Sequence, residues 1–274
     1  MIKHWKTATP LIALLAVIAV LTFYSDTEKP KPDSLTIGGI TKEFNASQVK
    51  DEYTMERAAF VKSDEKISVE IGDKKSDSFK QILKLRSANK ELISEVLGLG
   101  SGDLSFEGDK IIYGDGKIEL NFYEIPSQEA QNKNQITPTG IYAYEQEIIL
   151  KTNPSNNVVE VAIDSGDLSV RKNGDGTFEF YEQISLPEGM PDEEKEGINT
   201  DVVRFRIDPI VVKDSKGTEA KIETAFENGV LTITIPQDFL EKAVYPVIID
   251  PSYTIDSGSA TTLATSYSNQ RRLV

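Results

Sequence analysis

The chain has 274 residues, a formal net charge of −14 at pH 7, no cysteine, and 39% hydrophobic residues. The negative charge excludes a nucleic-acid partner, which requires a basic surface, and it disfavours docking on anionic lipid head groups. The absence of cysteine excludes disulfides, thiol catalysis and cysteine-ligated zinc. The one histidine, His4, precedes the first apolar segment, so the rest of the chain cannot hold a Ser-His-Asp triad or a histidine metal site.

The first segment of the chain has the character of a membrane helix. Lys3 and Lys6 precede residues 7–25, which carry no charge. As a helix this run spans about 28 Å, close to the thickness of a bilayer core. The lysines predict a cytoplasmic N-terminus and an exported remainder. Because no small-x-small cleavage site follows, an uncleaved signal anchor is favoured over a cleaved signal peptide, which would give a secreted protein.

The apolar run from Leu11 to Val20 also resembles the N-terminus of type IV pilins. It lacks the glutamate that this family carries near the start of the run, and no Gly-Phe cleavage site precedes it. A pilin-like subunit is therefore an alternative, which predicts processing before Leu11. Residues 26–34 are charged and spaced by prolines, and they predict a linker that holds the next domain away from the membrane.

Short alternating segments dominate the chain after residue 35. Ile67 to Ile71 alternates and ends at a Gly-Asp turn. Residues 78–85 fit a helix or a strand, and residues 91–97 fit one short helix that ends at Gly98. Further strands are expected at residues 104–106, 110–113, 117–123, 146–151, 158–163, 168–171, 177–183, 203–207, 219–226 and 230–235.

The connections between these segments favour hairpins. Asn228-Gly229 gives the strongest local hairpin signal, and residues 173–176 form a second turn sequence of this kind. The stretches 126–140 and 186–199 are polar loops. Many short strands without helix–strand alternation predict an all-β fold, mainly an antiparallel β-sandwich, together with one N-terminal hydrophobic helix.

Residues 231–251 form the most distinctive stretch. A strand with apolar residues at every second position ends at Pro236, and a short helical turn with Phe239 and Leu240 follows. A second, largely apolar strand then stops at Asp250-Pro251. The pattern predicts that the core is closed here.

The ending Tyr245-Pro246-Val247-Ile248-Ile249-Asp250-Pro251 resembles the close of a β-rich module in uncharacterised bacterial and phage-like surface proteins. The resemblance also takes in residues 67–72 and 147–154. It implies strands at residues 78–85 and 91–97 and a further domain after the module, but it implies no chemistry.

These patterns predict four segments. Residues 1–25 are a signal anchor or signal peptide, and residues 26–34 are a linker. Residues 35–251 are the β-rich region, which holds one or two sandwich domains with an alternative boundary near 126–145. Residues 252–274 are rich in small and hydroxyl residues, and they predict a linker into a further domain beyond Val274.

Three acidic sequences resemble pieces of calcium loops: residues 164–167, 173–176 and 114–116. None has the spacing of an EF-hand or its terminal glutamate, and turn formation explains all three. Calcium remains the metal that the oxygen ligands of this chain would suit best. No catalytic, cofactor-binding or metal-binding residue is assigned.

The remaining polar groups also have structural explanations. The acidic run Glu193–Glu196 has the composition of a glycosidase acid–base pair, but a solvated loop explains it. Arg204 and Arg206 share one strand face, as on the solvent side of an amphipathic strand, rather than marking an anion site.

Four tyrosines could form an aromatic platform for sugar rings or a protein partner, or they could be half-buried sheet tyrosines: Tyr123, Tyr142, Tyr144 and Tyr181. The sequence therefore predicts a cell-surface or secreted structural or adhesive module, anchored through residues 7–25. It presents a further domain or binds a glycan or surface protein. The alternative is the N-terminal part of a carbohydrate-active enzyme with its catalytic domain downstream.

Overall fold

The computed structural model describes residues 33–37, 40–44, 53–63, 67–125, 142–195, 198 and 200–256. The chain divides into two compact units, Met1–Asp33 and Ser34–Val274. The expected membrane segment, residues 7–25, lies outside the described residues. Within the described ranges no helix is long and apolar enough to cross a membrane.

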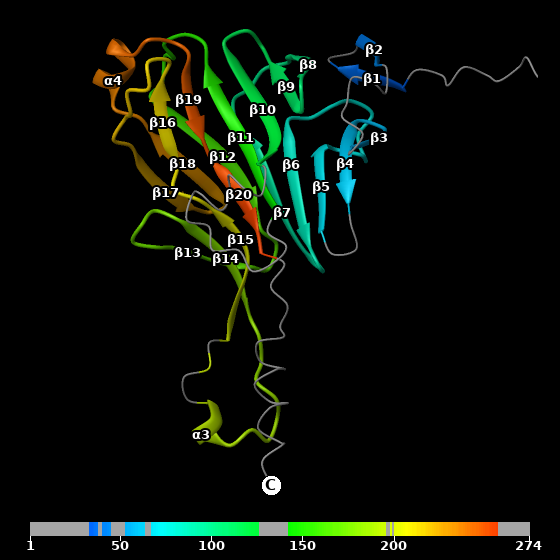
Figure 1. Cartoon of the computed structure of the whole chain (residues 1–274), viewed down its shortest axis with the longest axis vertical. Helices are drawn as coiled ribbons and strands as arrows, with labels where there is room; N and C mark the ends of the chain where they lie inside the picture. The colour runs from blue at the N-terminus through cyan, green and yellow to red at the C-terminus, as the bar shows by residue number, and fades with distance from the viewer. Residues whose placement is uncertain are drawn as a thin grey trace, which may run out of the picture. The chain divides into compact units, whose positions relative to one another are not determined.

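The described residues form mainly antiparallel β-structure with two large sheets (Figure 1). A separate two-stranded sheet joins β1 (Asp33–Ile37) and β2 (Ile40–Phe44). The eight-stranded sheet, called the first sheet below, has the order β17-β18-β12-β7-β6-β5-β4-β3. Its strands are β3 (Thr54–Glu56), β4 (Ala59–Ser63), β5 (Ile67–Gly72), β6 (Ile82–Ser87), β7 (Lys90–Val96), β12 (Val158–Asp164), β17 (Glu223–Glu227) and β18 (Val230–Thr234).

The ten-stranded sheet, called the second sheet, follows the path β13-β14-β15-β20-β11-β10-β9-β8, and β16 and β19 lie beside this path. Its strands are β8 (Asp103–Glu107), β9 (Lys110–Gly114), β10 (Ile118–Ile125), β11 (Tyr142–Leu150), β13 (Ser169–Lys172), β14 (Phe178–Gln183), β15 (Asp201–Ile207), β16 (Val211–Asp214), β19 (Val247–Asp250) and β20 (Ser252–Ile255). Among the described residues, two short helices, α3 (Asp192–Lys195) and α4 (Gln237–Lys242), lie in connections.

Two prolines interrupt long strands of the second sheet without ending the sheet. Pro251 separates β19 from β20, and both strands pair with the central strand β11. Pro209 lies between β15 and β16, which pair with β20 and β19 respectively. Proline has no N–H to donate to a β-ladder, so each proline interrupts the hydrogen bonding of its strand. The strands before and after the proline nevertheless follow one another at the same place in the sheet.

The position of β20 differs from the expected end of the β-rich region at Pro251. Ser252–Ile255, expected as the start of a linker, pairs with β11 on one side and β15 on the other. Tyr253 and Ile255 are fully buried. The small and hydroxyl residues around them suggested a linker, but Tyr253 and Ile255 keep the alternation of a central strand.

Alternating side chains from both large sheets form a single buried core cluster. In β18 the expected alternation is confirmed, because Leu231 and Ile233 are buried and the intervening Thr232 is half-buried. Phe226 of β17 packs edge-on against Phe180 of β14, with ring centroids 5.9 Å apart. The cluster contains residues from before and after the alternative boundary near 126–145, so the described residues on both sides share one core.

The segments that fitted either a helix or a strand are strands. Residues 82–87 and 90–96 form β6 and β7, each hydrogen-bonded to a neighbour on both sides. Local hairpins form where turn chemistry predicted them. Asn228 and Gly229 both have positive φ, 50° and 78°, as the tight turn between β17 and β18 requires. The helical turn after Pro236 is α4, with Leu240 buried.

Candidate functional site

Polar side chains at core-facing strand positions link the two sheets near the margins of the core. Lys62 of β4 forms an ion pair with Glu124 of β10. Lys90 at the start of β7 pairs with Glu182 of β14 at 3.1 Å. In β10, Glu124 lies on the same core-facing side as the buried Leu120 and Phe122. A charged residue therefore takes the place of an apolar one where the strand leaves the core.

Two further marginal links use backbone acceptors. Lys172 of edge strand β13 donates to the carbonyl oxygen of Thr224 at 2.6 Å and to its hydroxyl at 2.9 Å. Thr224 lies on β17, the edge strand of the first sheet. The hydroxyl of Ser87 donates to the Asp256 carbonyl at 3.2 Å. Lysine on an edge strand also discourages pairing with another chain.

A polar trio joins the two sheets in the middle of the core. Ser94 of β7 lies 2.7 Å from Gln146 Oε1 of β11 and 2.7 Å from the Tyr253 hydroxyl of β20. The Tyr253 hydroxyl also donates to Gln146 Oε1, at 3.0 Å. All three side chains are buried, and burial raises the pKa of Tyr253, so its hydroxyl stays neutral. These contacts and the four marginal links are called the inter-sheet ties below.

The outer face of the second sheet carries a polar row centred on Glu147 of β11. Tyr123 donates to Glu147 Oε1 at 2.8 Å, and Asn121 donates to Glu147 Oε2 at 3.1 Å. Lys110 reaches Oε2 at 3.3 Å and lies over the Tyr123 ring, 4.2 Å from its centroid. Burial, followed by the nearby Glu147 carboxylate, raises the pKa of Tyr123. The tyrosine is therefore a neutral hydrogen-bond donor and not a nucleophile.

On the same face, Ser252 donates to both oxygens of Glu145, at 2.8 and 2.9 Å. Two other buried acceptor oxygens on this face lack a donor within the described ranges. Asn121 Oδ1 and Asp250 Oδ1 have no hydrogen-bond partner among the described residues. No group of three or more carboxylates or histidines in the described part of the chain is arranged to hold a metal ion. The row is therefore a hydrogen-bonded network of the sheet surface.

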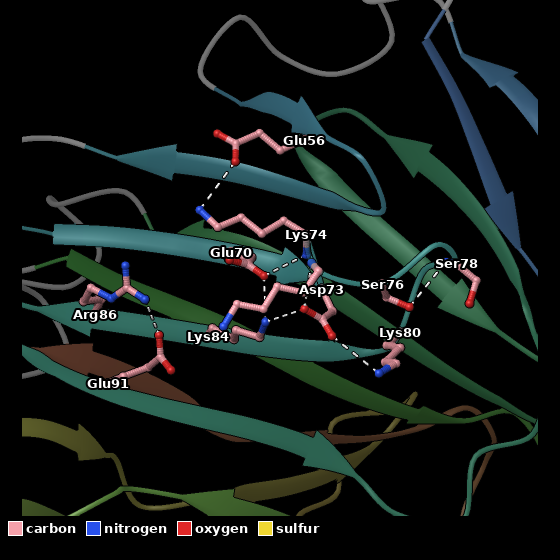
Figure 2. Close-up of polar contacts among 11 residues, drawn as sticks. Glu56, Glu70, Asp73, Lys74, Ser76, Ser78, Lys80, Lys84, Arg86 and Glu91 are labelled. Carbon is pink, nitrogen blue, oxygen red and sulfur yellow. Dashed lines mark hydrogen bonds and ion pairs between the residues drawn. The ribbon is translucent and has the colours of Figure 1, made fainter.

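A second charged cluster lies on the first sheet, around the β5–β6 connection. Figure 2 shows Lys84 between two carboxylates, 2.7 Å from Glu70 Oε1 and 2.9 Å from Asp73 Oδ1. The hydrogen bond from Lys84 is the main reason that the pKa of Asp73 falls from an ordinary 3.8 to about 2. Burial opposes the charge of Lys84, but its hydrogen bonds to both carboxylates raise its pKa overall. The lowered pKa of Asp73 and the raised pKa of Lys84 keep both groups charged at neutral pH, so Lys84 is not a nucleophile.

The residues singled out in the sequence as calcium-loop candidates form turns. The Asp115 carboxylate accepts the N–H groups of Lys117 and Ile118, at 2.9 and 3.0 Å. Asp164 and Asp175 each accept one N–H two residues along the chain, both at 3.0 Å. Such bonds hold the backbone of an Asx turn and explain these aspartates without a cation.

The two arginines of β15 are paired with carboxylates. Arg204 pairs with Glu182 of β14, and Arg206 pairs with Glu179 at 3.3 Å and with Asp256 at 3.5 Å. These pairs connect neighbouring strands of the second sheet. Both guanidinium groups are therefore engaged by carboxylates.

The three tyrosines whose side chains are described do not form one platform. Tyr144 is buried in the core cluster, whereas Tyr123 belongs to the outer polar row. Tyr181 lies beneath Arg171, whose guanidinium carbon is 4.6 Å from the ring centroid. The side chain of Tyr142 lies outside the described residues. In the acidic run, Glu193 is exposed on α3 and Glu196 lies outside the described residues.

The inter-sheet ties were not found by sequence reasoning. Their signal is a polar residue at a core-facing position, such as Ser94 between the buried Leu92 and Val96. This signal can identify the polar residue, but it cannot identify the partner, because the partner is distant in the sequence. No family model matches the chain, and neither curated proteins nor solved structures give a match.

Proposed function

We propose that the chain is a structural or adhesive module of a cell surface, which spaces or presents a further domain or binds a surface partner. The observation that supports this proposal best is the set of inter-sheet ties. In a two-layer module that only buries apolar faces, the hydrophobic driving force between the layers is non-directional. Hydrogen bonds and ion pairs have preferred geometry, so ties at the margins and the centre oppose sliding of one sheet over the other.

The location of the module follows from the sequence. The uncharged residues 7–25 anchor the chain, and the proline-spaced residues 26–34 separate the anchor from the sheets. With a cytoplasmic N-terminus, the sheets lie outside the cell. In this arrangement a β-sandwich that resists shear is a suitable spacer between the membrane and a partner.

The location is tested by antibody labelling of cells. The full chain is expressed with a C-terminal epitope tag in a bacterial host without an outer membrane. Intact cells should label as strongly as permeabilised cells. In a matched variant, Leu14→Lys and Val17→Lys interrupt the apolar run, and each lysine costs about 3 kcal/mol at a membrane-helix centre. That variant should lose surface labelling. Labelling of the original chain only after permeabilisation would contradict the proposal.

A further inference from the structure

A polar hollow lies where the edges of the two sheets meet. It has a volume of about 580 Å³, within the range of roughly 300–1,000 Å³ typical of small-molecule sites. Its walls come from the β13–β14 turn, the β15–β16 connection and the start of β17. We call it the turn hollow, and it is lined by Lys172, Asn173, Gly174, Asp175, Gly176, Pro209, Ile210, Ile222, Glu223 and Thr224.

One inter-sheet tie holds the walls of the turn hollow together. Lys172 on one wall donates to the carbonyl and hydroxyl of Thr224 on the other. The turn itself is fixed, because Gly176 donates to the Asn173 carbonyl at 3.1 Å and Asp175 accepts the Thr177 N–H at 3.0 Å. The hollow is therefore formed before a ligand arrives, which lowers the entropic cost of binding.

The groups that line the turn hollow divide into an aliphatic part and a polar part. Pro209 contributes ring carbons, and the half-buried Ile210 and Ile222 pack against the core. Within the described chain, no hydrogen bond or ion pair engages the side-chain amide of Asn173 or the carboxylate of Glu223. These two groups remain available to a ligand.

The charges of the lining narrow the class of ligand. Asp175 and Glu223 outnumber Lys172, whose ammonium group is already hydrogen-bonded to Thr224. An anion is disfavoured here, and the net charge of −14 adds to that effect. A metal ion is also disfavoured, because the lining offers only two carboxylates and no group of three or more His, Cys, Asp or Glu gathers anywhere in the described residues. Carboxylate and amide oxygens beside aliphatic carbons suit a neutral ligand with hydroxyl donors and an apolar C–H face.

We propose that the turn hollow is a binding site for a neutral saccharide unit. Hydroxyl groups of the sugar donate to Glu223 and exchange hydrogen bonds with Asn173, and a C–H face of the ring lies against Ile210 and Ile222. The inference rests on the proposed function, of which it specifies one partner, a surface glycan. It assigns the adhesive contact to the meeting edges of the sheets rather than to the tyrosines.

The experiment is saturation-transfer NMR on the full chain in detergent micelles. The probes are the methyl glycosides of glucose, galactose, mannose and N-acetylglucosamine, each tested separately. At least one probe should receive saturation, most strongly at its ring C–H protons. Asn173→Ala removes the side-chain amide, and Glu223→Gln replaces a charged acceptor by a weaker, neutral one. Each change should weaken binding roughly three- to tenfold.

A matched carboxylate serves as control. Glu219→Gln changes an exposed residue that lines a different hollow beside α4, and it should leave binding unchanged. The proposal is overturned if the folded chain, checked by circular dichroism, transfers saturation to none of the four probes. It is also overturned if both turn-hollow variants bind as well as the original chain, or if the control weakens binding equally. Surface labelling without glycoside binding would overturn this inference and leave the proposed location intact.

Discussion

Removing two hydroxyl groups from the central polar trio should cost more than the sum of the two single changes. Tyr253→Phe leaves Gln146 Oε1 with the Ser94 hydroxyl at 2.7 Å, and Ser94→Ala leaves it with the Tyr253 hydroxyl at 3.0 Å. Each single variant loses one net hydrogen bond, worth about 1 kcal/mol. In a domain of this size that loss lowers Tm by about 2–4 °C.

The double variant changes the situation of Gln146. Its side chain is 0% exposed, and Nε2 already has no partner among the described residues. Without both hydroxyls the whole amide is buried without a partner, which adds a desolvation penalty of about 1–3 kcal/mol. We therefore expect a total loss of about 3–5 kcal/mol. Adding Gln146→Leu to the double variant should recover at least about 1 kcal/mol, because the unpartnered amide is gone.

The measurement is urea unfolding of residues 34–274, followed by circular dichroism, with the free energy of unfolding extrapolated to water. Tyr113→Phe is the control, because its hydroxyl bonds to Gly102 N–H at 2.8 Å, apart from the trio. Combined with Ser94→Ala it should be additive within about 0.5 kcal/mol. Additivity of Ser94→Ala with Tyr253→Phe would refute the reasoning, as would a triple variant no more stable than the double.

Two further predictions concern the first sheet. Lys84→Met leaves the buried Glu70 without its ammonium partner and should cost about 2–3 kcal/mol at pH 7. Because the pKa of Asp73 falls from 3.8 to about 2 on folding, its stabilisation is complete above about pH 4 and is lost as pH falls towards 2. The difference in unfolding free energy between Lys84→Met and the original chain should therefore shrink between pH 5 and pH 2, and an equal difference at both pH values would argue against the cluster. Gly72→Ala should cost more than about 2 kcal/mol in the same urea assay, because Gly72 has φ +106° and an added Cβ would lie 2.4 Å from the Ala58 carbonyl oxygen. Gly174→Ala meets nothing within 4 Å and should be nearly neutral, so equal costs for the two changes would contradict this explanation.

Features set by neighbouring residues could be predicted from the sequence. The turn at Asn228-Gly229 has the positive φ values that its two residues favour, and α4 follows Pro236 as expected. The alternation of residues 231–235 gave the buried face of β18 correctly. In each case the signal is local, because it depends on backbone preference or on the side-chain period of a strand.

Features set by distant residues could not be predicted in the same way. Residues 91–97 have a pattern that also suits a helix, but most of them form a strand, β7, because they pair with β6 and β12. Ser94 meets Tyr253, 159 positions later in the chain. The strand after Pro251 is another case, since its burial depends on β11 and β15 rather than on its own composition.

The central claim is that the inter-sheet ties make the two sheets one cooperative unit. Hydrogen exchange of residues 34–274 at increasing urea, read by mass spectrometry, tests it most directly. Peptides from β6 and β7 and peptides from β11 and β20 should lose protection at the same urea concentration, through one global opening. In the Ser94→Ala/Tyr253→Phe variant both sheets should shift together to lower urea. Loss of protection in one sheet while the other remains protected would contradict the claim.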